Sequence, residues 1–221
     1  MSHTTPPPNG PHQGQPVLMA GEPPGQAGAA MILLHGRGAT AADILTLVPS
    51  LDHGSFAYLA PQAAGHTWYP NSFLAPLASN EPRLSSALAI IADLLDRVEA
   101  AGLPPERVIL LGFSQGASLA LEFAARHARR YGGVVGLSGG LIGPDGAPRA
   151  YSGSLAETPV FLGCSDADPY IPLARVHHTA AVLQGLGGAV AERLYLNMGH
   201  TIVPDEINAV RDMMSALLNG H

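Results

Sequence analysis

Ser114 lies in the pentapeptide GFSQG, residues 112–116, which fits the G-x-S-x-G pattern of a nucleophilic serine. An apolar segment typical of a buried strand, residues 107–113, comes before it, and a segment with helical spacing follows. A serine in a sharp strand-to-helix turn has a strained backbone, and the flanking Gly112 and Gly116 leave room for such a turn. We therefore take Ser114 as the candidate nucleophile rather than as an ordinary helix N-cap.

A second segment, GLSGG at residues 136–140, also fits the pattern and contains Ser138. The following residues, GLIGPDGAP, are rich in Gly and Pro and cannot start a helix at once. Ser138 is therefore the less favoured candidate.

A serine hydroxyl becomes a strong nucleophile when an imidazole takes its proton and a carboxylate holds that imidazole in place. Asp168 follows the apolar segment 159–164, and His200 follows the strand-like segment 189–196. The chain order Ser, Asp, His, with each residue after a separate strand, is the order of the α/β-hydrolase triad. We therefore expect Ser114, Asp168 and His200 to meet.

Asp166 is the rival carboxylate, and it could instead hydrogen-bond the backbone of its turn. Pro169 favours Asp168, because it fixes an extended exit from the loop. His53 and His66 lie in predicted loops and remain candidates for minor roles. The other histidines lie near the termini or on predicted helices: His3, His12, His127, His177, His178 and His221.

Attack on a carbonyl leaves negative charge on its oxygen, which preorganised N–H donors stabilise. The N–H of Gln115 stands at the positive end of the predicted helix after Ser114. A Gly-rich turn, HGRG at residues 35–38, directly follows another apolar strand and allows close backbone approach. We expect its Arg37 N–H to be the second donor.

Apolar strands alternate with amphipathic helices along the chain, which favours a mainly parallel sheet with helices on both faces. The segments 16–21 and 29–35 form a predicted hairpin that supplies an antiparallel edge. The predicted strands are residues 16–21, 29–35, 56–61, 107–113, 132–138, 159–164 and 189–196. The predicted helices are 41–51, a helix that starts at 81 or 82 and ends near 102, 117–130, 173–187 and 205–218. Only 20 residues, 139–158, separate two of these strands, so no cap domain is expected.

The long connection 62–80 carries aromatic residues and is of the kind that usually bears function. Trp68, Tyr69, Phe73 and Leu74 are expected to form an apolar wall over the acyl or alcohol group of a substrate, or else to be core anchors.

Length and composition limit the number of domains, the partners and the location that can be expected. The chain of 221 residues predicts one domain, residues 15–221, after a flexible tail at residues 1–14 that is rich in Pro and Gly. A net charge of −6 without a basic cluster argues against nucleic acid and anionic membranes as partners. Cys164, the single cysteine, reads as a buried thiol. No segment has the pattern of a signal peptide or a membrane span, so the cytoplasm is the expected location.

No phosphate-binding Gly loop and no spacing of metal ligands occurs, so neither a cofactor nor a metal is expected. Several segments together resemble the phospholipase/carboxylesterase family of α/β-hydrolases, which includes acyl-protein thioesterases. These segments are LLHGRGA, PQAAGHTWYPNSFLAPLASNEPRLSSAL, LLGFSQGASLAL, SDADPYIP and NMGHTIVPDEI.

The resemblance implies a cofactor-free serine esterase with the triad and the oxyanion donors given above. Arg37 stands where thioesterase relatives tend to carry an apolar residue, which argues against long-chain acyl substrates. The leading hypothesis is thus a carboxylesterase for short to medium acyl or aryl esters, and a small-molecule ester is its expected partner. A thioesterase, a lysophospholipase and a non-catalytic binding protein are the alternatives. Homodimers occur among relatives, so a homodimer is compatible with the resemblance.

Overall fold

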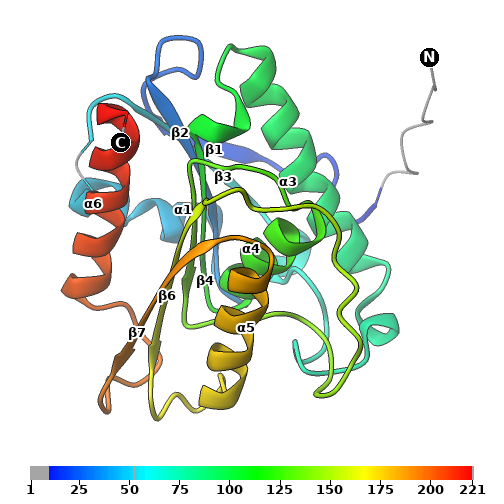
Figure 1. Cartoon of the computed structure of the whole chain (residues 1–221). Helices are drawn as coiled ribbons and strands as arrows, with labels where there is room; N and C mark the ends of the chain where they lie inside the picture. The colour runs from blue at the N-terminus through cyan, green and yellow to red at the C-terminus, as the bar shows by residue number, and fades with distance from the viewer. Residues whose placement is uncertain (1–9, 52, 221) are drawn as a thin grey trace.

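A seven-stranded sheet forms the centre of the computed structural model, which describes residues 10–51 and 53–220 (Figure 1). The strand order is β1-β3-β2-β4-β5-β6-β7, with β1 antiparallel to β3 and the other neighbouring strands parallel. The strands are β1 (Val17–Gly21), β2 (Ala29–Leu34), β3 (Phe56–Pro61), β4 (Val108–Phe113), β5 (Gly133–Leu137), β6 (Pro159–Ser165) and β7 (Ala189–Tyr195). This is the α/β-hydrolase fold that the sequence predicts.

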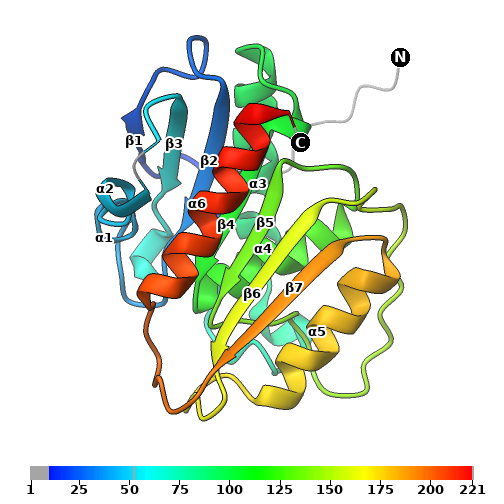
Figure 2. The ribbon, with the colours of Figure 1, turned by 60° about the vertical axis from the view of Figure 1, so that its left-hand side comes forward.

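Helices cover both faces of the sheet, and Figure 2 shows α6 lying across the front of it. Side chains alternate between the faces along each strand. In β2, Ile32 and Leu34 belong to the core cluster that also holds buried residues of α3, α4 and α5. Met31 and Leu33 belong to the cluster on the other face, which holds buried residues of α1, α2 and α6. The helices are α1 (Ala41–Leu45), α2 (Val48–Leu51), α3 (Arg83–Ala100), α4 (Gln115–Arg126), α5 (Leu173–Gly185) and α6 (Pro204–Asn219).

Two local predictions are wrong. The antiparallel edge strand β1 pairs with β3 rather than with its neighbour in sequence, β2, so the expected hairpin does not form. The predicted helix at 41–51 is two short helices, α1 and α2, with a break at residues 46–47. Thr40 caps α1 through its hydroxyl, which accepts the N–H of Asp43, whose side chain in turn accepts the N–H of Thr40.

The predicted flexible tail, residues 1–14, overlaps the described residues only at residues 10–14. There the chain forms a turn against α3, and the N–H of His12 donates to Ser86 Oγ at 3.0 Å. The side chain of His12 is fully buried, and its two ring nitrogens bond to backbone groups of the loop after β3. Residues 10–14 are therefore packed rather than free, and residues 1–9 lie outside the described residues.

The carboxyl ends of the parallel strands are left uncovered by any cap domain in the described chain, since residues 138–158 between β5 and β6 hold no helix. Among the described residues, none of the helices combines the length and the apolar character needed to cross a membrane.

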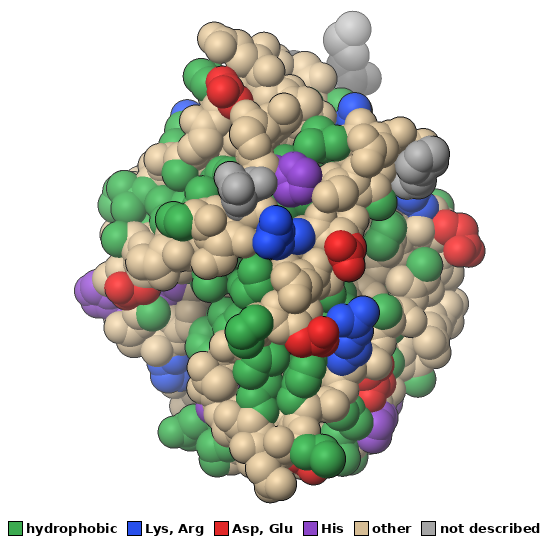
Figure 3. Space-filling view, turned by 90° about the vertical axis from the view of Figure 1, so that its left-hand side faces the viewer, with side chains coloured by type: hydrophobic (Ala, Val, Ile, Leu, Met, Phe, Trp, Pro, Cys, Tyr) green, Lys and Arg blue, Asp and Glu red, His purple; other side chains and the backbone are tan. Residues whose placement is uncertain are grey.

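The face on the side of α6, which Figure 3 shows, mixes side chains of all kinds. Hydrophobic side chains gather below its centre, and basic side chains stand near acidic ones instead of forming a basic patch among the described residues. Leu194, near the end of β7, and Leu196, which follows the strand, are exposed. This face thus lacks the clustered positive charge that nucleic-acid binding uses.

Candidate active site

Ser114 occupies the sharp turn between β4 and α4, with φ 55° and ψ −116°, a backbone conformation that side-chain-bearing residues rarely adopt. The two flanking glycines make the turn possible. A Cβ at Gly112 would lie 2.1 Å from the carbonyl oxygen of Gly116, and a Cβ at Gly116 would lie 2.0 Å from that of Leu34. The glycines of GFSQG therefore serve close backbone packing, as the sequence predicts.

Three side chains from three strand ends form one hydrogen-bonded chain. His200 Nε2 lies 2.8 Å from Ser114 Oγ, and His200 Nδ1 lies 2.7 Å from Asp168 Oδ2. The side chain of Asp168 is fully buried and that of His200 is 17% exposed. The rings of Phe113 and Tyr170 lie beside the imidazole, at 5.1 and 4.9 Å between ring centroids. The imidazole is thus held between a buried carboxylate and an accessible serine.

The loop after β6 distinguishes the two candidate carboxylates. Asp168 Oδ1 accepts the N–H groups of Tyr170 and Ile171, which leaves Oδ2 facing His200. Asp166 turns to a different partner, and its Oδ1 accepts the N–H of Asn197 at 2.8 Å. The geometry therefore brings Asp168 to the imidazole and gives Asp166 the backbone role that was its alternative.

The other nucleophilic side chains near the strand ends are buried. Ser138 also has a positive φ, of 53°, but its side chain is fully buried behind β5. Burial raises the pKa of the Cys164 thiol to about 12, and the Asp168 carboxylate adds to the rise. Cys164 is therefore a neutral core thiol at ordinary pH.

The segment after β3 is fixed to the serine turn by the side chain of Gln115. Its Oε1 accepts the N–H of Trp68 and its Nε2 donates to the carbonyl of Tyr69, both at 2.8 Å. Trp68 Nε1 donates to the carbonyl of His35, at the start of the HGRG turn. Burial lowers the pKa of His35, whose Nε2 accepts the N–H of Ala63. A neutral imidazole thus holds the turn after β2 in place.

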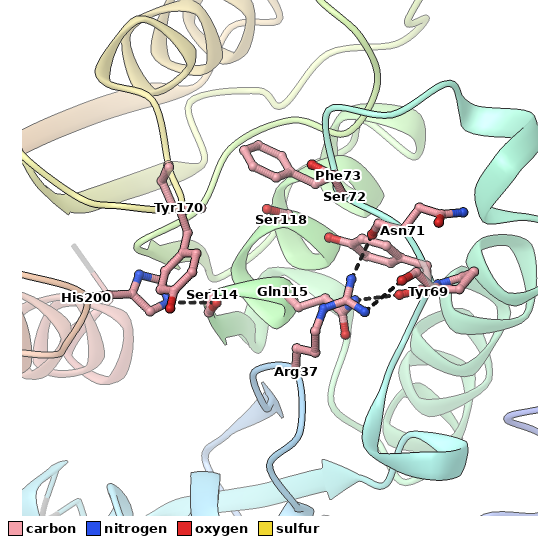
Figure 4. A pocket seen from close by; sticks show the side chains of 12 residues that line it. Arg37, Tyr69, Asn71, Ser72, Phe73, Ser114, Gln115, Ser118, Tyr170 and His200 are labelled. Atoms are coloured by element: carbon pink, nitrogen blue, oxygen red, sulfur yellow. Dashed lines mark hydrogen bonds between the residues drawn. The ribbon is translucent and has the colours of Figure 1, made fainter.

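A cavity of about 580 Å³ opens beside Ser114 (Figure 4). Figure 4 shows Tyr170 and His200 on one side of Ser114, and Arg37 and Tyr69 on the other. The lining residues are Arg37, Tyr69, Pro70, Asn71, Ser72, Phe73, Ser114, Gln115, Ser118, Tyr170, Ile171 and His200. The pocket therefore has a serine, an imidazole, aromatic rings, neutral polar groups and the guanidinium of Arg37 around one opening.

The turn after β2 lies directly against the serine. A Cβ at Gly36 would be 3.4 Å from Ser114 Cβ, and Arg37 follows it on the pocket wall. The N–H of Gln115 belongs to the first residue of α4 and so has no partner inside the helix. Both backbone segments that were predicted to donate to an oxyanion therefore border the same pocket as Ser114.

A model of the family described as phospholipase/carboxylesterase matches residues 17–218, nearly the whole chain. The chain belongs to the phospholipase/carboxylesterase family. A solved structure of a phospholipase/carboxylesterase from Dyadobacter fermentans is similar along 91% of this chain and 96% of its own, with 41% identity and a TM-score of 0.87. Family membership and fold therefore agree with the sequence motifs.

Two further proteins show a more distant likeness. Acyl-protein thioesterase 1 of Gibberella zeae is 34% identical over 127 residues, which are 53% of this chain and 51% of that protein. The match to this protein and to the similarly named protein of Saccharomyces cerevisiae spans about half the length of each of those two relatives. The structure of acyl-protein thioesterase 2 of Zea mays shares the fold, with 21% identity, a TM-score of 0.71 and coverage of 92% and 98%.

The four residues that were predicted to form an apolar wall divide into residues that line the pocket and residues that lie in the core. Tyr69 and Phe73 line the pocket, whereas Trp68 is fully buried behind it and Leu74 packs against the core without lining it. Trp68 belongs to the hydrophobic core, and the backbone carbonyl of His35 accepts its indole N–H there. Trp68 and Leu74 are thus core anchors, the alternative that the sequence left open.

Sequence reasoning missed several pocket residues that lie close to predicted ones. Tyr170 follows Asp168 by two residues, in the motif SDADPYIP, and this proximity is a signal that could have found it. Ser118 lies one helical turn after Ser114, so it faces the same side of α4. His53 and His66, the two loop histidines, bond instead to Ser215 Oγ and to the carbonyl of Ala39.

Glu206 in the first turn of α6 is fully buried under β6. Its Oε2 accepts the N–H of Val203, and a Cβ at Gly163 would lie 2.1 Å from its Oε1. Burial raises the pKa of Glu206 to about 7, while the Val203 hydrogen bond acts in the opposite direction. The folded protein therefore binds this proton more tightly than the unfolded chain does, so the contribution of Glu206 to stability falls as the pH rises through 7.

We expect Glu206→Gln to stabilise the protein most at high pH, since Gln keeps an acceptor for Val203 without carrying charge. The difference in unfolding free energy between the variant and the wild type should grow by about 2–3 kcal/mol from pH 5 to pH 8. Urea unfolding of both proteins at each pH measures it. A difference that does not change with pH would contradict the buried titration.

Proposed function

We propose that this protein is a serine hydrolase that cleaves carboxylic esters with short to medium acyl or aryl groups. The observation that carries the proposal is the hydrogen-bonded chain from Asp168 through His200 to Ser114, which ends at an open pocket. A serine beside an imidazole that is oriented by a carboxylate is the arrangement of acyl-transfer enzymes on several folds. Membership of the phospholipase/carboxylesterase family supports the same reaction.

In the first half of the proposed reaction, Ser114 Oγ attacks the ester carbonyl carbon, and its proton passes to His200 Nε2. Asp168 stabilises the resulting imidazolium through Nδ1. The N–H groups of Arg37 and Gln115 donate to the oxyanion, because both backbone segments border the serine. The carbon–oxygen bond then breaks, and the alcohol leaves with the proton from His200.

In the second half, water attacks the acyl group on Ser114 while His200 takes a proton from the water. The tetrahedral intermediate then collapses, the carboxylic acid is released, and Ser114 Oγ regains its proton from the imidazolium. These steps require only side chains and backbone groups of the described residues together with water.

The size and lining of the pocket support short to medium esters. The cavity is bounded by the rings of Tyr69, Phe73 and Tyr170, and Arg37 stands at its edge. A long alkyl chain would have to pass polar groups such as Asn71 and Ser72. Thioester hydrolysis is the second candidate, because relatives are named acyl-protein thioesterases and the same steps cleave a carbon–sulfur bond.

A series of p-nitrophenyl esters from acetate to palmitate tests the proposal, with Ser114→Ala as the baseline. We expect serine-dependent hydrolysis that peaks at short to medium chains, and labelling of Ser114 by a serine-directed phosphonate. Activity that rises toward palmitate, or faster cleavage of matched thioesters, would assign the protein to the lysophospholipase or thioesterase branch. Absence of both hydrolysis and labelling would leave a binding protein on this scaffold.

A further inference from the structure

The side chain of Arg37 is a cation on the pocket wall with no carboxylate within 4.0 Å among the described residues. The other lining residues are neutral side chains, apart from His200. The pocket therefore has one permanent charge, which is positive, in a chain whose net charge is −6. A cation here is not explained by the proposed attack on an ester, which uses only the backbone N–H of Arg37.

The guanidinium has a fixed position. Arg37 Nη1 donates to the carbonyl of Pro70 at 2.9 Å, and Nη2 donates to that of Asn71 at 2.7 Å. The accepting segment is itself held, since the N–H of Asn71 donates to Asn80 Oδ1, whose side chain is buried. Figure 4 shows the guanidinium reaching from the turn after β2 to this segment. The charge thus stays at the pocket instead of moving freely in solvent.

The two hydrogen bonds leave part of the guanidinium free for a ligand. An arginine side chain has five N–H donors, and two of them reach these carbonyls, so three have no acceptor among the described residues. Neither carbonyl acceptor carries a full charge, so the positive charge is not neutralised. Anionic oxygen groups match such a fork, because they accept two parallel N–H bonds.

We propose that this pocket selects esters that carry an anionic oxygen group, a carboxylate or a phosphate, at the end of the acyl or alcohol part remote from the ester. In the proposed complex Ser114 attacks the ester carbon while the free N–H donors of Arg37 bind the anion. This inference rests on the proposed ester hydrolysis and adds the charge of the substrate to it. A half-ester of a dicarboxylic acid is the simplest substrate of this class.

A matched substrate pair tests the inference. Mono-p-nitrophenyl adipate ends in a carboxylate, and its methyl ester has the same chain without the charge. We expect the wild type to show a kcat/KM for the acid on the order of tenfold above that for the methyl ester, the size expected of one charge-assisted contact. An acyl chain of similar length that ends in a phosphate shows which of the two anions is preferred.

Arg37→Gln is expected to abolish this preference, and Arg37→Lys to retain part of it. A loss shared by both substrates reports on the turn and its backbone N–H, so only the ratio of the two kcat/KM values reports on the side-chain charge. Arg211→Gln removes one positive charge on α6, away from the pocket lining, and should leave the ratio unchanged.

Two results would overturn the inference while leaving the ester hydrolase in place. One is a wild-type ratio near one, and the other is a ratio that Arg37→Gln does not change, which would make Arg37 a purely structural anchor. Hydrolysis of neither adipate ester would overturn the inference, and the proposed function falls with it only if the p-nitrophenyl series and the phosphonate also give no reaction.

Discussion

Asp168→Asn is expected to lower kcat/KM for p-nitrophenyl butyrate by about 10⁴-fold, as in a serine protease triad. The contacts of Asp168 give the reason. The amide oxygen of Asn can still accept the N–H groups of Tyr170 and Ile171, so the loop keeps its shape. The amide NH₂ then faces His200 Nδ1, and two donors cannot share a hydrogen bond. The imidazole must carry its proton on Nε2, where it cannot accept the proton of Ser114.

Asp166→Asn is the matched control, because it makes the same chemical change two residues earlier. Its oxygen can continue to accept the N–H of Asn197, and it has no contact with the imidazole. We expect kcat/KM to stay within about threefold of the wild type, as for surface substitutions away from special features. A larger loss in Asp166→Asn than in Asp168→Asn would reverse the assignment of the carboxylate.

The positions of Ser114, Asp168 and His200 could be predicted because each follows its own strand. In a parallel sheet the carboxyl ends of the strands meet at one edge, so three loops far apart in sequence converge there. The two glycines beside the serine also supported the prediction. The structure explains why they are needed, because a Cβ at Gly112 would clash with the carbonyl of Gly116, and a Cβ at Gly116 with that of Leu34. The sequence pattern was therefore enough to predict which residues meet wherever their position after a strand decides the contact.

Other contacts depend on how loops pack and leave no periodic signal in the sequence. His12 reads as a residue of a polar tail, yet its ring nitrogens satisfy the carbonyl of Trp68 and the N–H of Ala64. The aromatic character of Trp68 was equally compatible with a pocket wall and with a core anchor. Trp68 packs into the core, where the carbonyl of His35, 33 residues away, accepts its indole N–H, and no local pattern reports that contact.

The orientation of Arg37 also lay beyond the sequence. The HGRG turn predicted the position of its backbone, but the direction of its side chain depends on the carbonyls of Pro70 and Asn71, on a separate loop. The pairing of β1 with β3 could not be predicted either. Two strands that are adjacent in sequence normally form a hairpin, and here β3 lies between β1 and β2 in the sheet.

Gly116→Ala is expected to lower both stability and activity severely. The added Cβ would lie 2.0 Å from the carbonyl oxygen of Leu34 and 2.7 Å from that of His35, and both are backbone atoms. The start of α4 must therefore move away from β2. We expect a loss of more than about 3 kcal/mol in unfolding free energy, or about 6–12 °C in Tm. The shift would also displace Ser114 and the turn after β2, and a misplacement near 1 Å costs on the order of 10²-fold in rate.

Gly185→Ala separates this steric effect from the general effect of replacing a glycine in a helix. Gly185 ends α5, and a Cβ there would have no neighbour within 4 Å. Because Ala has the higher helix propensity, we expect Gly185→Ala to keep full activity and to gain about 0.5–1 kcal/mol. Thermal unfolding and p-nitrophenyl butyrate hydrolysis of both variants distinguish the steric effect at Gly116 from the general effect of replacing a glycine. A Gly116→Ala protein with wild-type Tm and activity would show that α4 can withdraw from β2 without cost, and the tight turn around Ser114 would then not be what holds the nucleophile in position.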